Sequence, residues 1–212
     1  MFKDICSKIS HLRGSLKPDT RKITRLLPKL RAVEAEQNQA RLRREADLGD
    51  PDAQVSLGQL CFYGRDGVAQ DYQQAIIWFQ KAASQGDIWA QLHLGRLYET
   101  GRGVLQDFFE AIHYYELAAA QGDLNAQWNL ALIYSEAGGR PVDLIEAHKW
   151  FNIVGSQIPP DNFDMRDEVV AARDKLAANM TPHEVAEAQR LAREWMGSHH
   201  RPRLHIAVAG AA

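Results

Sequence analysis

The chain has 212 residues, a net charge of −2 and 45% hydrophobic residues, enough to build the core of one ordinary domain or of an elongated array. No segment approaches the ~18 apolar residues of a transmembrane helix, and the N-terminus lacks the apolar run of a secretory signal. With only two cysteines, Cys6 and Cys61, the chain is expected to be cytoplasmic, in a reducing compartment.

The charge is unevenly distributed along the chain. Residues 1–45 carry twelve Lys or Arg and five Asp or Glu, a balance of +7 that leaves −9 for residues 46–212. Apolar residues recur at helical spacing near the start, which predicts a short basic amphipathic helix. It either docks on an anionic membrane surface or an acidic partner, or packs against the rest of the chain. The apolar positions are Phe2, Ile5, Ile9, Leu12 and Leu16.

A second apolar stripe runs through Ile23, Leu26, Leu27, Leu30 and Val33. It crosses a proline at position 28, which we expect to kink a helix or to mark its start. The segment "QARLRREADLGD" that follows has the spacing of the second half of a degenerate first repeat. We therefore expect an N-terminal capping helix before Asp50.

Three similar segments occupy the centre of the chain. They are "AQVSLGQLCFYGRDGVAQDYQQAIIWFQKAASQGD" from Ala53, "AQLHLGRLYETGRGVLQDFFEAIHYYELAAAQGD" from Ala90, and the weaker "AQWNLALIYSEAGGRPVDLIEAHKWFNIVG" from Ala126. Self-similarity at a period of about 20 to 50 residues indicates a repeat array in which each unit buries its apolar face against its neighbours. The extra residue of the first copy falls in its loop, "GRDGV" against "GRGV".

Each unit is predicted to be a pair of helices. Ala90, Leu94 and Leu97 form one helical stripe in the first half, and a second stripe that includes Tyr115 follows. Gly95 lies on the first stripe, where glycine costs about 1 kcal/mol relative to alanine. Its presence there, and that of Gly58 in the first copy, predicts two helices too close together for a larger side chain.

The expected boundaries of these helices carry turn and capping residues. Gly101 and Gly103 are predicted to take positive φ in the reversal between the two helices. Asp107 is predicted to cap the second helix in a capping box with Glu110. Aspartates are expected to begin the first helix of each unit. These are Asp50, Asp87 and Asp123.

The pattern A-x-x-x-L-G-x-x-Y-x-x-G-x-G-V-x-x-D-x-x-x-A-x-x-W/Y-x-x-A-A-x-x-G-D-x-x-A resembles the Sel-1-like repeat, a relative of the tetratricopeptide repeat. The resemblance covers roughly Ala46 to Gly155, and the third copy departs from it at Ala137 and Arg140, where Gly and Val are expected. It implies an all-α fold, a right-handed α/α superhelix with a concave groove. It also implies an adaptor or scaffold function.

The chain is predicted to divide into four parts. Residues 1–45 form the basic N-terminal segment and cap, and residues 46–158 hold about three repeats. Residues 159–197 form C-terminal capping helices, the last of which starts at a capping box from Thr181 to Glu184. The segment "NMTPHEVAEAQRLAREW" there resembles the tail of bacterial Sel-1-like proteins. Residues 198–212 are expected to be disordered.

No catalytic signature accompanies the repeats. The sequence contains no Walker A loop, G-x-S-x-G elbow, G-x-G-x-x-G fingerprint or H-E-x-x-H helix, and none of the serine-lactamase motifs. His199, His200 and His205 lie in a terminal tail, where histidines are more often solvated than metal-bound. We therefore expect no enzymatic activity, no cofactor and no metal site.

The predicted partner-binding surface lies in the groove. In tetratricopeptide-like arrays the first helix of each pair lines the concave face, so its positions off the apolar stripe are candidates for contact. Trp128 and Arg96 are the most prominent, because such residues often dominate binding energy; the alternatives are packing for Trp128 and a solvated or ion-paired Arg96. The candidates are Val55, Ser56, Gln59, Leu92, His93, Arg96, Glu99, Trp128, Asn129, Leu132 and Ser135.

Two functional hypotheses follow. The first is a non-enzymatic adaptor that holds a protein or peptide partner in the groove. The second is a peripheral membrane or nucleic-acid-associated protein that acts through residues 1–45. Nucleic acid is the less favoured partner, because Phe2 is the only aromatic residue in that segment.

Overall fold

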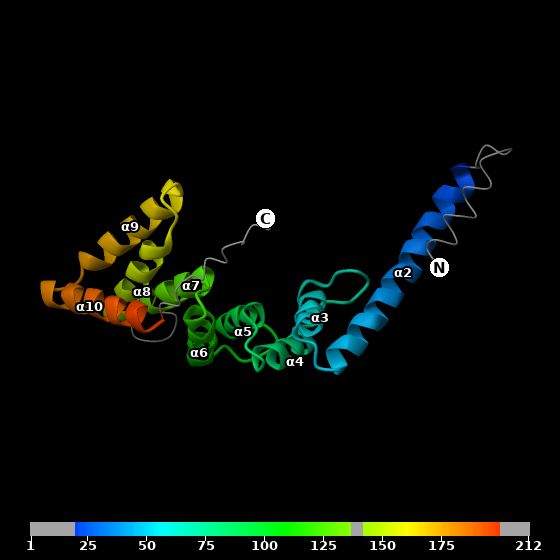
Figure 1. The fold of residues 1–212 in the computed structure, drawn as a ribbon, viewed down its shortest axis with the longest axis horizontal. Coiled ribbons are helices and arrows are strands. Elements are labelled where there is room, and N and C mark those ends of the chain that lie inside the picture. The colour runs from blue at the N-terminus through cyan, green and yellow to red at the C-terminus, as the bar shows by residue number, and fades with distance from the viewer. Residues whose placement is uncertain (1–19, 137–141, 200–212) are drawn as a thin grey trace, which may run out of the picture.

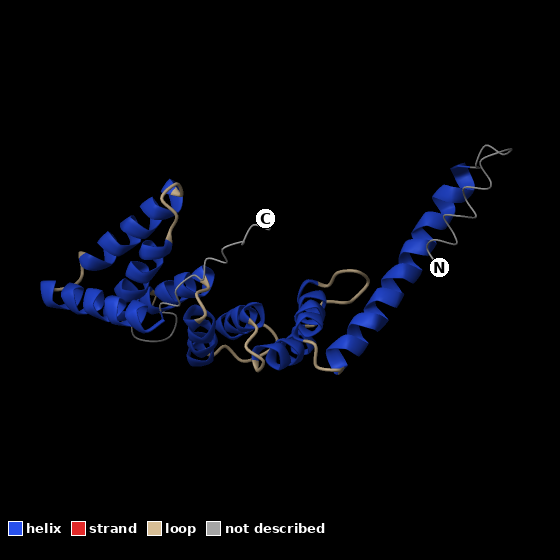
Figure 2. Cartoon of the chain, viewed as in Figure 1, coloured by secondary structure: helices blue, strands red, loops and turns tan. Residues whose placement is uncertain are grey.

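A computed structural model describes residues 20–136 and 142–199, and every regular element among them is a helix (Figure 2). The predicted amphipathic helix of residues 2–16, the third turn with Ala137 and Arg140, and residues 200–212 lie outside the described residues. The helices are α2 (Thr20–Asp47), α3 (Pro51–Tyr63), α4 (Tyr72–Ala83), α5 (Ile88–Thr100), α6 (Phe108–Ala120), α7 (Leu124–Ser135), α8 (Leu144–Gln157), α9 (Phe163–Ala177) and α10 (Pro182–His199).

The six central helices form three antiparallel pairs that stack along one direction. Helix α3 packs on α4, α5 on α6 and α7 on α8, and successive pairs meet through α4 with α5 and α6 with α7. Figure 1 shows the result as an elongated array with α2 extending from one end and α9 and α10 at the other. One pair cannot bury its own apolar stripe, so the pairs stack into an all-α solenoid, as predicted.

Buried residues between the pairs follow the predicted stripes. Ala90, Leu94 and Leu97 have no exposed surface. The close helix contact expected at Gly95 is also present, because a Cβ atom there would lie 2.4 Å from Cε1 of Tyr115. At Gly58 the corresponding distance to Cε1 of Phe79 is 2.5 Å. The two glycines therefore seat an aromatic ring of the paired helix.

The turns within the repeats take the predicted backbone conformation. Gly101 and Gly103 have φ of 66° and 75°. The Asp107 carboxylate caps α6 by accepting from the N–H groups of Phe109 and Glu110, at 2.9 and 3.1 Å. The predicted capping box is incomplete, however, because the Asp107 N–H donates to the Tyr98 carbonyl at 3.0 Å. The donor that Glu110 would accept from is used to close the helical hairpin instead.

The capping box at the start of α10 is complete. The Thr181 N–H donates to Oε2 of Glu184 at 2.7 Å, and the Glu184 N–H donates to Oγ1 of Thr181 at 3.3 Å. These bonds from Thr181 stabilise the charged carboxylate and lower the pKa of Glu184. The predicted start of the last helix is therefore confirmed.

A ladder of glutamines, absent from the sequence-based expectations, joins the two helices of each pair and also reaches back to the preceding pair. The Gln91 side chain donates to the Ala83 carbonyl at 3.4 Å and accepts from Gln121 Nε2 at 2.9 Å. The same pattern recurs on both sides, with Gln85 donating to Gln54 at 2.9 Å and Gln157 donating to Gln127 at 2.7 Å. Each buried amide on a first helix therefore bonds to a glutamine at the end of its own paired helix.

Helix α2 ends as the predicted first cap. Ala46 is buried, Gly49 has φ of 99° and the Asp50 carboxylate accepts from the Ala53 N–H at 3.0 Å, as at the later repeat junctions. The helix does not start at Pro28, since α2 begins at Thr20 and continues through the proline. At the other end α9 packs on α8, and α10 returns to pack on α8 as well.

Candidate functional site

Three of the predicted groove residues are buried and therefore do not offer a surface to a partner. Val55 and Leu92 are 9% and 7% exposed and belong to the hydrophobic clusters between the repeats. His93 is 5% exposed. The prediction that these three residues contact a partner protein is therefore wrong. The second helix of the same repeat and the neighbouring repeats together bury a wider part of the first helix than the predicted apolar stripe.

His93 is packed among aromatic rings. It stacks on Phe79 with ring centroids 4.9 Å apart and an interplanar angle of 3°, and its centroid lies 5.2 Å from that of Phe62. Its Nδ1 atom is buried without a hydrogen-bond partner. Burial, with a smaller contribution from the Arg96 guanidinium, lowers the pKa of His93 to about 4. The residue is a neutral core histidine.

A polar cluster joins α5 and α7, the first helices of two successive pairs, to α6 between them. The Tyr115 hydroxyl of α6 donates to Oε2 of Glu99 on α5 at 2.6 Å, and the Asn129 side chain of α7 interacts with the same hydroxyl. Burial, followed by the charge of Glu99, raises the pKa of Tyr115, so the hydroxyl keeps its proton. We call Arg96, Glu99, Tyr115 and Asn129 the groove cluster.

Arg96 is the exposed member of the groove cluster. It lies one helical turn before Glu99 on α5, and its charge is a minor cause of the pKa shifts of His93 and Tyr115. No Asp or Glu of the described segments lies within ion-pair distance of it. The ion-paired alternative for Arg96 is therefore not what the structure shows.

The remaining predicted residues lie in two other environments. Trp128 and Leu132 are half-buried against the largest hydrophobic cluster, and Trp128 makes an edge contact with Phe151 at 5.5 Å. Ser135 is half-buried and donates to the Leu132 carbonyl. Ser56 lines a cleft of about 550 Å³ between α2 and α3, and Gln59 is half-buried on α3.

Tyr115 is the residue of the groove cluster that the sequence analysis assigned only to the core. The other two repeats have phenylalanine at the same phase, Phe79 and Phe151, and both are buried. The tyrosine hydroxyl, where the other repeats have phenylalanine, was the sequence feature that indicated a polar contact. The residue that accepts its hydrogen bond, Glu99 of the preceding helix, is identified only by the tertiary structure.

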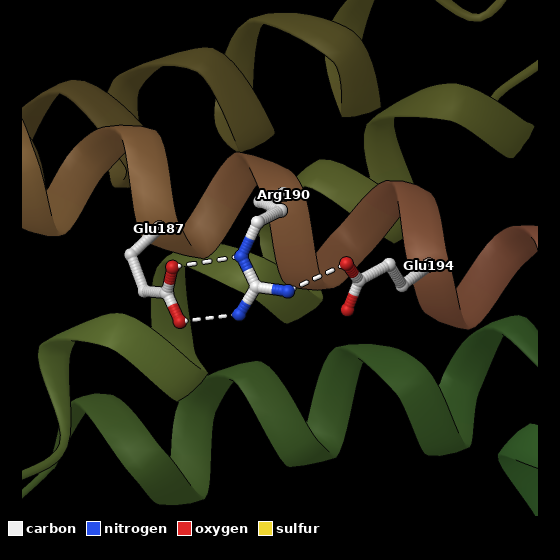
Figure 3. A network of polar contacts seen from close by, with 3 residues as sticks. All are labelled: Glu187, Arg190 and Glu194. Carbon is white, nitrogen blue, oxygen red and sulfur yellow. Dashed lines mark hydrogen bonds and ion pairs between the residues drawn. The ribbon is translucent and has the colours of Figure 1, made fainter.

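A second polar network lies on α10, the last described helix. Arg190 of α10 bonds to both oxygens of Glu187, at 2.6 and 2.9 Å, and to Glu194 at 2.5 Å (Figure 3). All three lie on one helix at spacings of three and four residues, where exposed ion pairs add little to stability. The network stabilises α10 and is separate from the groove cluster.

Within the described residues, no group of three or more His, Cys, Asp or Glu side chains is placed to hold a metal ion. His200 and His205 lie outside this part of the chain. No helix in the described segments is both long enough and apolar enough to cross a membrane.

Comparison with known proteins identifies the repeats. The Sel1 repeat profile matches residues 51–87, 90–123 and 124–153. A Sel1 repeat protein from Oxalobacter formigenes is 31% identical in sequence, with a TM-score of 0.51, over 62% of this chain and 98% of that one. The chain belongs to the Sel1-repeat family. Sel1 repeats are generally protein-interaction modules, and the fold is typically a non-enzymatic scaffold.

Two further comparisons are narrower. A protective antigen of uropathogenic Escherichia coli strains with an SLR fold has 24% identity and a TM-score of 0.53, covering 76% of this chain and 41% of that one, and shows the shared fold. Protein sel-1 homolog 2 of Mus musculus and of Rattus norvegicus is 55% identical over 38 residues. That match spans 18% of this Sel1-repeat chain and 6% of each mammalian protein.

Proposed function

We propose that this Sel1-repeat protein is a non-enzymatic adaptor that binds a segment of a partner protein along its first helices. The observation that supports this most directly is Arg96, which is exposed, has no ion-pair partner in the described segments, and lies one helical turn before Glu99, the acceptor of the Tyr115 hydroxyl. Arginine in such a setting forms charge-assisted bonds to carboxylates and carbonyls, which gives a partner peptide both affinity and orientation.

The groove cluster is suited to this role because three of its members, Glu99, Tyr115 and Asn129, are hydrogen-bonded to one another before binding. The bond between Tyr115 and Glu99 joins two helices of one repeat, and Asn129 extends the contact to the next repeat. Side chains that are already ordered lose little conformational entropy when a partner binds. Trp128 would supply apolar contact on the same helix as Asn129, although part of its surface serves the core.

We test the proposal with affinity capture from native lysate, using wild type and Arg96→Glu as baits. Arg193→Glu, an exposed position on α10, is the matched control for the same change of charge. We expect Arg96→Glu to lose a partner protein that wild type and Arg193→Glu both retain, with all three equally helical by circular dichroism. Equal capture by all three baits would remove the groove cluster from the proposal.

Trp128→Ala serves as a second bait only if it remains folded, because its contact with Phe151 also stabilises the core.

A cytoplasmic location is part of the same proposal and rests on Cys61, a free thiol, together with the absence of paired cysteines in the repeats. Cell fractionation with detection of the full-length protein tests it.

A further inference from the structure

The first repeat differs from the other two at one aromatic position. Cys61 of α3 has the same place in its repeat as Tyr98 of α5 and Tyr134 of α7. In the second repeat the Tyr98 ring stacks on Tyr114 of the paired helix, with ring centroids 5.7 Å apart and an interplanar angle of 12°. Trp78 of α4 takes the place of Tyr114 in the first repeat. The first repeat therefore keeps one ring of this pair and has a small thiol in place of the other.

The smaller side chain leaves a cavity of about 500 Å³ between the first repeat and α2. The Trp78 ring borders the cavity, and its walls are more apolar than polar. In the second repeat Tyr98 packs against the cluster that contains Leu97, which has no exposed surface, whereas the corresponding Leu60 is half-buried and lines the cavity. The space that a tyrosine ring fills in one repeat is therefore open in the other. The apolar lining residues are Leu57, Leu60, Cys61, Val68, Ala69 and Trp78.

Cys61 is a wall of this cavity rather than a reactive group. Burial, followed by the nearby Asp71 carboxylate, raises the pKa of its thiol, and the charge of Arg43 opposes this by less. The thiol therefore stays protonated and behaves as a small apolar side chain.

The charged groups at the rim differ in whether they are already engaged. The Asp71 carboxylate accepts from the Gln74 N–H at the start of α4, at 3.0 Å. Arg43 is exposed, lines the cavity and forms no ion pair with the described residues. Its guanidinium is therefore open to an acidic group that arrives with a ligand.

From this arrangement we propose that the cavity receives an aromatic side chain of a partner protein, which stacks on Trp78 as Tyr98 stacks on Tyr114. Stacking of two rings is favourable beyond the burial of their area, which an aliphatic side chain does not reproduce. A carboxylate next to that ring in the partner would pair with Arg43. The proposal rests on the adaptor function proposed above and adds a contact outside the groove cluster, since no member of the cluster lines the cavity.

The Trp78 ring has room for this contact. Lys81 Nζ lies over the ring at 4.1 Å, but Lys81 is exposed and is not a wall of the cavity. The cation therefore leaves free the part of the ring that borders the cavity.

The chain itself offers little to fill this cavity. Among the residues outside the described segments, Phe2 is the only phenylalanine, tyrosine or tryptophan. The following residue is Lys3, whose charge Arg43 would repel. A ring supplied by another protein, with an acidic neighbour, matches the charge at the rim better.

The test measures how fast iodoacetamide alkylates Cys61 in the full chain, in a Cys6→Ser background that leaves Cys61 as the only thiol. The probe is N-acetyl-tyrosine amide, and N-acetyl-leucine amide is the matched control because the two differ only in the side chain. We expect the tyrosine probe to protect Cys61 at concentrations at least about threefold lower than the leucine probe. Equal protection by the two probes, or protection by neither, would overturn the proposal.

Two variants test the position of the ring. Cys61→Tyr should fill the cavity, raise the midpoint of urea unfolding and abolish binding of the tyrosine probe, as measured by ligand-observed NMR. Cys61→Ser is the control, which keeps a small side chain and should bind as wild type does. Trp78→Leu, if circular dichroism shows it folded, should lose the preference for tyrosine over leucine. Undiminished probe binding by Cys61→Tyr would place the probe elsewhere and sink the proposal.

The other occupants give different results, each of which would also overturn the proposal. Faster alkylation of Cys61 in Phe2→Leu without any probe would show that the chain's own ring fills the cavity. A dimer by light scattering that becomes a monomer in Cys61→Tyr would indicate a second copy. Binding of 4-methylphenol but not of N-acetyl-tyrosine amide would indicate a free small molecule. Arg96→Glu should bind the tyrosine probe normally, so failure of this proposal and failure of the groove cluster are distinguishable.

Discussion

At the scale of single residues, the two positions with the clearest consequences are Gly95, which packs against the ring of Tyr115, and the buried His93. Both lie on α5: Gly95 faces the Tyr115 ring of the paired helix α6, and His93 stacks on the Phe79 ring of α4 in the preceding repeat. Tyr115 has no freedom to move away, because it is fully buried and its hydroxyl is bonded to Glu99.

Gly95→Ala is expected to destabilise the protein by about 1–3 kcal/mol, although alanine is the better helix former by about 1 kcal/mol. The new Cβ would lie 2.4 Å from the ring of Tyr115. Gly197→Ala in α10 is the control, since nothing lies within 4 Å of its Cβ position, and it should be neutral or stabilising. Urea unfolding compares the two, and similar effects of both variants would contradict the packing argument.

His93 makes stability depend on pH. Its pKa is about 4 in the folded protein against an ordinary value of 6.5, so the unfolded chain takes up a proton first. This stability is fully present above pH 6.5 and is lost as pH falls toward 4, by up to about 3 kcal/mol. His93→Phe keeps the stacked ring without a titrating group and should flatten the profile.

Urea unfolding at pH 7 and pH 4.5 measures this difference. The same replacement at exposed His113 of α6 is the control and should leave the wild-type pH dependence in place. Parallel profiles for wild type and His93→Phe would mean that other groups govern the acid response.

At the scale of the elements, the glutamine ladder holds the two helices of one repeat against each other. A side chain at the end of each second helix bonds to a buried glutamine of the preceding first helix, as Gln121 does with Gln91 at 2.9 Å. Gln121 also donates to the Gly86 carbonyl at 3.0 Å. Helix packing alone allows the two helices of a pair to slide along each other, whereas these bonds define one register.

Replacing the donor should cost more than replacing the acceptor. Gln121→Leu leaves the buried oxygen of Gln91 without a donor and is expected to cost about 1–3 kcal/mol, whereas Gln91→Leu should cost less, because Gln121 is exposed and still donates to the Gly86 carbonyl. The double variant should cost less than the sum, because no unpaired partner remains. A double-mutant cycle by urea unfolding measures the coupling, and additive effects would show that the two amides act independently.

At the scale of the whole molecule, the two ends of the solenoid are closed differently. The C-terminal end is covered by α10, whose Trp195 makes an edge contact with Trp150 at 5.2 Å. Trp150 is thereby only 2% exposed. The N-terminal end is covered by the C-terminal half of α2, while the N-terminal half of this helix extends beyond the array (Figure 1).

Trp195→Ala is expected to destabilise the protein by about 3–5 kcal/mol, because it removes a large side chain from the end of the core. It should also expose Trp150, which acrylamide quenching of tryptophan fluorescence detects. Trp89→Ala is the control, since Trp89 is 58% exposed and should have little effect on stability. Unchanged stability of the Trp195 variant would mean that α10 does not hold this end together.

The sequence by itself determined the helix pairs, their boundaries and their stacking, because these follow from local periodicity and from caps within a few residues of one another. Asp50, Asp107 and Thr181 cap the helices where their neighbours in sequence predict it. The tertiary structure decided the rest of the site. Whether His93 is exposed, what Tyr115 bonds to, and which face of α2 meets α3 all depend on other helices. The glutamine bonds likewise join residues 30 or 31 positions apart, a distance at which the sequence alone does not specify which side chains meet.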